Sequence, residues 1–257
     1  MNPWDGNMKP YNLISIETRL QADFTVLAKN LGADEATTQK WTQALISRYT
    51  EPQRYYHTIE HIYSMLICYG EYRYEIEDES VIKLAILFHD WIYDPRAQDN
   101  ELESVKCFQE FANEINLPQS TRLRVSEYIE RTITHTLPIK DRKVDSDLRF
   151  FLDFDLEVLS RNSTDYAVYA DQIRQEYSYF ADSDYCIRRI KVLKTFLDRE
   201  CLYFSDAFHK MYEETARGNL KGEIEMLERK LEDLNEDLGG VAGAAELEKA
   251  SYLHKSI

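Results

Sequence analysis

Apolar residues recur at intervals of three and four along most of this chain, and few residues interrupt the pattern. Near the N-terminus, for example, Ile16 is followed by Leu20, Phe24, Leu27 and Leu31. This spacing places apolar side chains on one face of an α-helix. The chain has 257 residues but only 8 glycines and 6 prolines, which is too few for the many turns of a β-sandwich. The sequence therefore predicts an all-α protein.

Capping and turn-forming residues divide the chain into separate helices. Asp34 is a suitable N-cap, Pro52 breaks the chain, and Pro118 suits a first helical turn. A short and very apolar helix, VIKLAILFHDWI, ends at the turn formed by residues 93–95. A polar loop is predicted for 137–144. The predicted helices are 13–31, 34–49, 56–72, 79–92, 100–115, 118–135, 148–159, 165–181, 183–199 and 206–238.

The last helix carries a stripe of apolar residues formed by Ile224, Leu227, Leu231, Leu234 and Leu238. The stripe is shorter than the three or four heptads of a convincing coiled coil. A terminal helix that packs on its own domain is therefore favoured over a homodimer seam. The following GGVAGAA segment predicts a flexible tail. We divide the chain into a main domain, residues 1–221, and a C-terminal helix with its tail, residues 222–257.

The chain is acidic, with 46 Asp and Glu residues, 31 Lys and Arg residues and a formal net charge of −15. Such a surface repels nucleic-acid backbones and anionic lipids, which argues against DNA binding and against a role at a membrane surface. A phosphorylated substrate must then be met by local positive charge, from a metal ion or a few arginines. Arg189, Lys191 and Lys194 share one helix and are typical of a solvated stripe.

The four cysteines lie in apolar helical stretches without CxxC spacing. This usage is typical of free thiols in a reducing compartment. The N-terminal segment lacks an apolar signal-peptide core, and no apolar run reaches membrane-spanning length. A cytoplasmic location is the expectation.

Histidines and carboxylates fall into two groups that suit metal chemistry. His57 and His61 are four residues apart and would share one face of a helix, with Arg54 beside them if the helix extends that far. His89 and Asp90 end the apolar helix, where polar side chains are costly unless something satisfies them. A divalent ion does so, and imidazole with carboxylate suits Mn, Fe, Co, Ni or Zn. Mg is a further candidate.

Seven short segments in a fixed order carry a family resemblance. They are Arg54-Tyr55-Tyr56-His57 with His61, Phe88-His89-Asp90-Trp91-Ile92-Tyr93-Asp94, Asn100-Glu101-x-x-Ser104, Thr132-x-x-His135, Phe151-Leu152-Asp153-Phe154-Asp155-Leu156, Arg174-x-Glu176-Tyr177 and Ala216-Arg217-x-Asn219-Leu220. With these segments the chain resembles, over about residues 10–225, the HD superfamily of metal-dependent phosphohydrolases. The resemblance implies a single HD-type helical bundle.

The resemblance also implies a ligand set. His61, His89 and Asp90 would bind the metal, and the fourth ligand would come from the Asp-Phe-Asp segment. Asp153 and Asp155 are two residues apart, so on a helix only one of them can face the ion. The resemblance favours Asp155. Asp153 would then be a cap or a partner that supports a ligand.

The remaining roles concern proton transfer and substrate binding. The spacing of the histidine pair is also similar to cyclic-nucleotide phosphodiesterases, in which the first histidine donates a proton, so His57 is the expected acid. Glu101 could transfer the proton or orient the attacking water, or only stabilise a helix N-terminus. Asp90 would hold the water together with the metal. Arg54 would pair with the phosphate. His135 could contact substrate, join a second ion or close a helix C-terminus.

These features predict a metal-dependent hydrolase that acts on a small phosphoester, with a nucleotide suggested by family analogy alone. One alternative is a non-catalytic binding or scaffold protein with the same fold. A second is a di-iron oxygenase of the HD type, which uses extra histidines between the His-Asp pair and the last aspartate. Only His135 lies in that interval, so the hydrolase is favoured.

Overall fold

The computed structural model describes residues 15–138 and 145–237, and within them it contains ten α-helices and one short 3-10 helix. The prediction of an all-α protein is confirmed. The predicted flexible tail, Leu238 and most of the predicted polar loop lie outside the described residues. The helices are α1 (Ile16–Asn30), α2 (Glu35–Tyr49), α3 (Ile59–Tyr72), α4 (Glu79–Phe88), α5 (Asn100–Glu114), α6 (Gln119–Thr132), α7 (Ser146–Asp155), η1 (Glu157–Ser160), α8 (Ser163–Glu176), α9 (Asp182–Leu197) and α10 (Asp206–Asp237).

Several of these helices begin at a residue whose side chain caps the helix, including Asp34, the N-cap that the sequence predicts. The Asp34 carboxylate accepts a hydrogen bond from the backbone N–H of Thr37 at 2.8 Å, as the capping pattern predicts. Gly32, with a φ of 98°, follows α1 in the left-handed conformation that glycine tolerates. Pro118 is the residue before α6 and does not lie in its first turn.

Several helices are shorter than predicted, and the differences in α3, α4 and α6 affect the candidate site, since α6 ends at Thr132 and leaves His135 beyond it. Helix α3 begins at Ile59, so His57 precedes the helix and does not share a helical face with His61. Helix α4 ends at Phe88, so Asp90 lies in the following turn. Apolar periodicity could not show these ends, because the residues beyond them also pack in the core and continue the apolar pattern.

Helix α4 is the centre of the first helical group. Seven of its ten residues are buried, and α3, α5, α6 and α7 all pack against it. At its C-terminal end Phe88 stacks on Trp91 with ring centroids 4.6 Å apart, and Trp41 and Phe111 complete this aromatic cluster. The Trp91 side chain is therefore a core anchor that holds the turn carrying His89 and Asp90.

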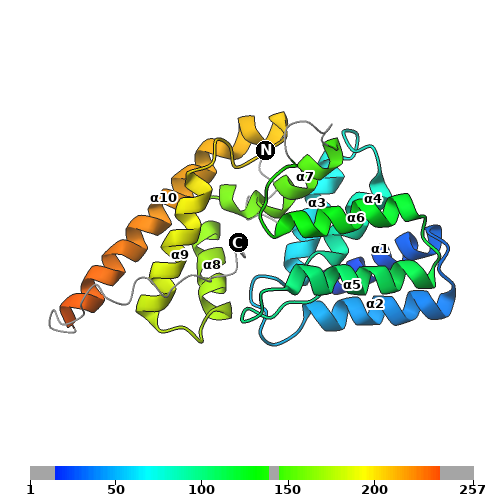
Figure 1. The fold of residues 1–257 in the computed structure, drawn as a ribbon, viewed down its shortest axis with the longest axis horizontal. Helices are drawn as coiled ribbons and strands as arrows, with labels where there is room; N and C mark the ends of the chain where they lie inside the picture. The colour runs from blue at the N-terminus through cyan, green and yellow to red at the C-terminus, as the bar shows by residue number, and fades with distance from the viewer. Residues whose placement is uncertain (1–14, 139–144, 238–257) are drawn as a thin grey trace.

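A second group of helices, α8, α9 and α10, lies on the other side of α7 and η1 (Figure 1). The long helix α10 packs along α9 and against η1. Ile224 and Leu227 of the predicted apolar stripe are buried, and Leu231 is partly buried against the same core. The first half of the stripe thus packs on its own chain, which is the arrangement that the sequence favoured.

Arg189 differs from the predicted solvated stripe. Arg189 is only 1% exposed, and its Nε donates to Glu223 Oε1 of α10 at 2.8 Å. Tyr166 donates to the other oxygen of Glu223 at 2.5 Å, and Arg189 also donates to the Tyr169 hydroxyl. A carboxylate 34 residues away satisfies the guanidinium, and helical charge patterning cannot reveal such a partner. Lys191 and Lys194 are exposed, as expected.

The other sequence predictions concern membranes and thiols. None of the described helices is long and apolar enough to cross a lipid bilayer. Cys68, Cys107, Cys186 and Cys201 are all free, and the first and third are buried.

The Arg189–Glu223 ion pair provides a test of how the second group is held together. Replacing Arg189 by Met leaves a buried carboxylate without its counter-ion, so we expect the free energy of unfolding to fall by about 3–5 kcal/mol. The double variant Arg189→Met, Glu223→Gln should recover part of this loss. Urea unfolding at neutral pH measures both values. A single variant as stable as the wild-type chain would contradict the structural role.

Candidate metal centre

His61, His89 and Asp90 form a cluster whose ligand atoms all lie within 4.8 Å of one another. His61 comes from the first turn of α3, and the other two residues follow directly after α4. The two imidazole Nε2 atoms are 3.3 Å apart. Asp90 Oδ2 lies 3.0 Å from His89 Nε2 and 3.7 Å from His61 Nε2. Packing of α3 against α4 therefore brings residues 28 positions apart to one point.

Asp155 adds a fourth donor from the last residue of α7. Its Oδ1 atom lies 3.1 Å from His61 Nε2 and 3.5 Å from His89 Nε2. Ligand atoms bound tetrahedrally to one ion lie about 3.3–3.6 Å apart, and the observed separations surround that range. Two imidazoles and two carboxylates are also a donor set for Mn, Fe, Co, Ni or Zn. The residues present therefore fit a divalent metal ion.

A hydrogen bond fixes which nitrogen of His89 faces the cluster. Its Nδ1 lies 2.9 Å from the carbonyl oxygen of Ile86, so Nδ1 carries the proton and donates. In the neutral ring, the unprotonated Nε2 is left for a metal. This is the usual arrangement of metal-binding histidines, in which the second ring nitrogen holds the orientation.

The electrostatics of the cluster favour a bound cation. Burial lowers the pKa of His89, but the Asp90 and Asp155 carboxylates outweigh burial and raise that pKa well above its usual value. Burial raises the pKa of Asp155, yet His89, His135 and His61 bring it well below its usual range. With neutral imidazoles, the two carboxylates leave two negative charges in a buried site. A divalent ion neutralises them.

Access to the cluster is from the side of Asp90. The Asp90 side chain is 17% exposed, whereas the His61 and His89 side chains are 2% and 1% exposed. The Asp155 side chain is 9% exposed, so Asp90 is the most exposed of the four donors.

His57 lies next to this cluster but is held by a different carboxylate. Its ring centroid is 5.9 Å from that of His61. Its Nδ1 lies 2.7 Å from Glu176 Oε2, at the end of α8. The ring stacks on Tyr93 with centroids 4.2 Å apart. Burial lowers the pKa of His57, but Glu176 and Asp90 more than compensate and raise it.

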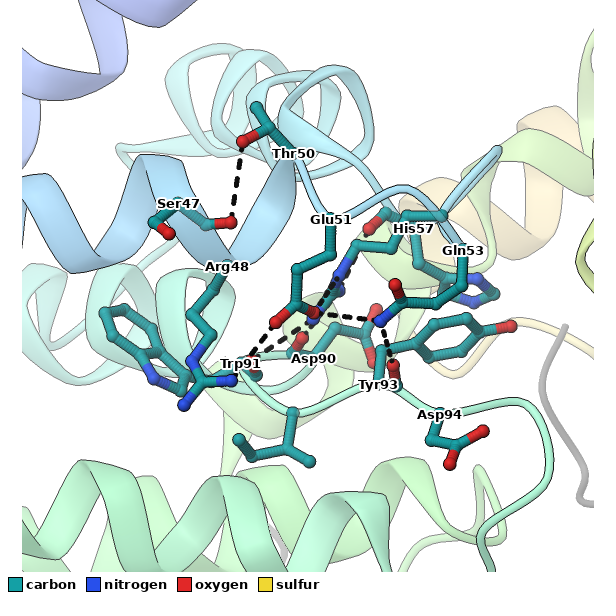
Figure 2. A network of polar contacts seen from close by, with 12 residues as sticks. Ser47, Arg48, Thr50, Glu51, Gln53, His57, Asp90, Trp91, Tyr93 and Asp94 are labelled. Atoms are coloured by element: carbon teal, nitrogen blue, oxygen red, sulfur yellow. Dashed lines mark hydrogen bonds and ion pairs between the residues drawn. The ribbon is translucent and has the colours of Figure 1, made fainter.

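Arg54 does not occupy the position expected for a phosphate contact. Its side chain is fully buried and donates to the backbone oxygens of His57, Asp90 and Trp91 at 2.8–3.1 Å and to the Glu51 carboxylate at 3.2 Å. Figure 2 shows the polar network that joins the segment before α3 to the turn after α4. Because buried carbonyls need donors, Arg54 is committed to holding these two segments together.

The structure places His135 behind Asp155. It follows α6 in a left-handed conformation, with a φ of 45°, and its Nε2 lies 2.7 Å from Asp155 Oδ2. The two oxygens of Asp155 thus face different groups: Oδ1 the histidine pair and Oδ2 His135. A hydrogen bond of this kind orients a carboxylate that binds a metal ion. His135 holds the candidate ligand Asp155, and the predicted substrate contact of His135 stays a prediction.

Glu101 and Asp153 complete the predicted set. Glu101 is buried in the first turn of α5, and its catalytic role stays a prediction. Asp153 points away from the metal cluster: its carboxylate accepts hydrogen bonds from the backbone N–H groups of Phe204 and Ser205 at 2.7 and 2.8 Å. It therefore anchors the segment that leads into α10. Burial raises the pKa of Asp153 to about 7, although these N–H groups oppose the shift.

Glu176 is the residue at the site that sequence reasoning left without a role. It lies in the segment Arg174-x-Glu176-Tyr177, but nothing in that segment indicates a partner 119 residues earlier. An isolated glutamate at the end of a helix is ordinarily solvated, and only its burial, at 3% exposure, marks it.

The fold and the site together define an all-helical protein with a buried cluster of two histidines and two aspartates that can hold a divalent ion. Comparison with protein-family models, with curated proteins and with solved structures found no match.

The two aspartates of α7 give opposite predictions. Asp155→Ala removes a ligand, so the protein should lose bound metal, measured by elemental analysis and by titration with Mn²⁺ or Zn²⁺. Asp153→Ala leaves two buried N–H groups without acceptors and should lower the free energy of unfolding by about 2–4 kcal/mol, with metal content kept. If Asp153→Ala loses metal while Asp155→Ala keeps it, the assignment of the fourth ligand is wrong.

Proposed function

We propose that the protein is a metal-dependent phosphohydrolase of the HD type that hydrolyses a small phosphoester. The observation that supports this most is the convergence of His61, His89, Asp90 and Asp155 on one point, with a buried and oriented histidine, His57, beside them. A metal ligand set alone would suit storage or structure. A metal ligand set with an acid beside it suits hydrolysis. The nucleotide class of substrate rests on the family resemblance.

Each residue has a distinct part in the proposed reaction. A divalent ion in this cluster would supply Lewis acidity toward a phosphoryl oxygen and a lowered pKa for a water ligand. Asp90, at the exposed side, is placed to accept a hydrogen bond from the attacking water. His57 protonates the leaving oxygen, a role worth about 10²–10⁴ in rate. His135 and Arg54 hold a ligand and the ligand-bearing turn in place.

Positive charge for an anionic substrate must come from elsewhere than Arg54. Arg199 donates to the backbone oxygens of Thr134 and His135 at 2.9 and 3.0 Å. Burial lowers the pKa of its guanidinium to about 10. Its bonds are to neutral carbonyls, so it keeps a net positive charge beside His135. This charge lies on the His135 side of Asp155 and not beside Asp90, so we propose that the divalent ion itself meets the phosphate.

The roles of His57 and His61 can be separated by measuring metal content and rate together. His61→Ala removes a ligand and should lose the ion. His57→Ala should keep stoichiometric metal and lose turnover by roughly 10²–10⁴. The loss should be smaller for nitrophenyl phosphate than for an alkyl phosphate, because a good leaving group needs less protonation. Protein purified without chelator or metal-affinity columns is assayed with Mn²⁺, Co²⁺, Ni²⁺ and Mg²⁺.

Three outcomes would contradict parts of this proposal. Equal metal loss in both variants would make His57 a ligand. Equal slowing of good and poor leaving groups by His57→Ala would show that His57 positions the substrate and transfers no proton. Bound metal without turnover on any phosphoester or nucleotide would reject the hydrolase.

A further inference from the structure

We propose that Glu176 is a positioning residue that holds His57 in the tautomer with the proton on Nδ1, which leaves Nε2 as the atom that serves the substrate. The consequence for catalysis rests on the proposed function of His57. The tautomer itself does not, since it follows from hydrogen bonds that can be tested without any substrate.

One oxygen of Glu176 holds the backbone before α3. Oε1 accepts hydrogen bonds from the N–H groups of Tyr55, Tyr56 and His57 at 2.8, 2.8 and 3.0 Å. Three successive backbone donors aimed at a single oxygen fix both the carboxylate and the chain that carries His57. This segment is not helical, so its N–H groups have no helical carbonyl to bond. Glu176 supplies the missing acceptor.

The other oxygen determines the tautomer. Oε2 lies 2.7 Å from His57 Nδ1 and 2.7 Å from the Tyr93 hydroxyl. An ionised carboxylate can only accept hydrogen bonds. Tyr93 and Nδ1 must therefore both donate, and Nδ1 must carry a proton. Tyr93 also stacks on the imidazole of His57. The stacking holds the face of the imidazole, and the hydrogen bond to Glu176 holds its edge.

The carboxylate is held in its ionised form. Burial raises the pKa of Glu176, but His57, Tyr93 and the backbone N–H groups outweigh burial and bring it to about 2. The side chain is fully buried, so water does not compete for these five hydrogen bonds. Glu176 is thus a buried acceptor whose donors are all fixed, the condition under which such a network specifies one arrangement.

Glu176 also connects the two helical groups. It ends α8, whereas His57 and Tyr93 belong to the segments beside α3 and α4. Just beyond it, Tyr179 donates to the backbone oxygen of Pro95 at 2.5 Å and its ring lies under Arg96. The end of α8 is therefore joined to the segment that follows Asp90.

The tautomer has a direct chemical consequence. In the charged ring, Nε2–H gives its proton to the leaving oxygen of the phosphoester, and the Nδ1–H bond to Glu176 stays in place. The neutral ring then has its lone pair on Nε2 and regains a proton there from water. In the opposite tautomer, the lone pair of Nδ1 would face a lone pair of the Glu176 carboxylate, and the two would repel.

The test is Glu176→Gln, which preserves shape. The three backbone N–H groups require the amide oxygen at the Oε1 position, so the amide nitrogen must take the Oε2 position and donate to His57 Nδ1. We expect His57 to change from the Nδ1–H to the Nε2–H tautomer. Proton–nitrogen multiple-bond NMR on the full chain with ¹⁵N-histidine reads this directly, at a pH at which the ring is neutral. His57→Gln assigns the signal.

Two controls separate this effect from a general change in structure. Glu213→Gln alters another glutamate that accepts backbone N–H groups, those of Leu202 and Tyr203, and should leave the His57 signal unchanged. Tyr93→Phe removes one donor but keeps the carboxylate, so His57 should keep Nδ1–H. In Glu176→Gln, turnover on an alkyl phosphate should fall by the same roughly 10²–10⁴ as in His57→Ala, with metal content kept.

The outcomes distinguish this inference from the proposed function. An Nε2–H tautomer in the wild-type chain overturns the inference, and this result does not depend on the folding of any variant. An unchanged tautomer in folded Glu176→Gln overturns it as well. If the wild-type chain hydrolyses no phosphoester, the proposed function fails, and the NMR result still decides the role of Glu176.

Discussion

The structure depends on a concentration of buried negative charge at the end of its most apolar helix. Asp90 and Asp155 meet two imidazoles where α4, the centre of the first helical group, runs into a turn. Two carboxylates in such a place destabilise the fold unless positive charge compensates them. Without an ion, the protein compensates the two carboxylates in part by raising the pKa of His89. A divalent ion would compensate them more completely. The helices around α4 are therefore arranged to bring the donors to one buried point.

Around this centre, buried polar side chains from distant elements bond to the backbone of three non-helical segments. Arg54 donates to three carbonyls and joins the segment before α3 to the turn after α4. Glu176 accepts from three N–H groups of the same segment. Asp153 accepts from two N–H groups before α10. Loops that lie inside a protein must satisfy their backbone groups, and here long side chains from distant elements do so. The segments that carry the site are thereby tied to the helices around them.

The second helical group contributes to the site through few but well-defined contacts. Glu176 ends α8, and Tyr169 of the same helix packs on Tyr56 with ring centroids 4.7 Å apart. Tyr169 in turn accepts a hydrogen bond from Arg189, whose partner Glu223 lies on α10. A continuous set of packed side chains thus runs from α10 to the histidine beside the metal cluster. The helices after α7 are part of the framework that orients His57.

Sequence by itself determined the helical class and most helix positions, and the family resemblance indicated which residues form the candidate metal cluster. Local physics is sufficient for the helices, because period 3.6 defines them and the Asp34 side chain caps its own helix. A histidine and an aspartate at the end of an apolar helix indicate a cation, but the full ligand set needed the resemblance. The resemblance limited the fourth ligand to Asp153 or Asp155, and helical period allowed only one of the two to face the ion. Tertiary structure alone decided the rest. Arg54, Glu176 and Arg189 have partners up to 121 residues away. The sequence does not distinguish a charged residue that is solvated from one that is satisfied by a buried partner. Only the packing of distant helices removes the solvent, and so only the fold assigns the partner.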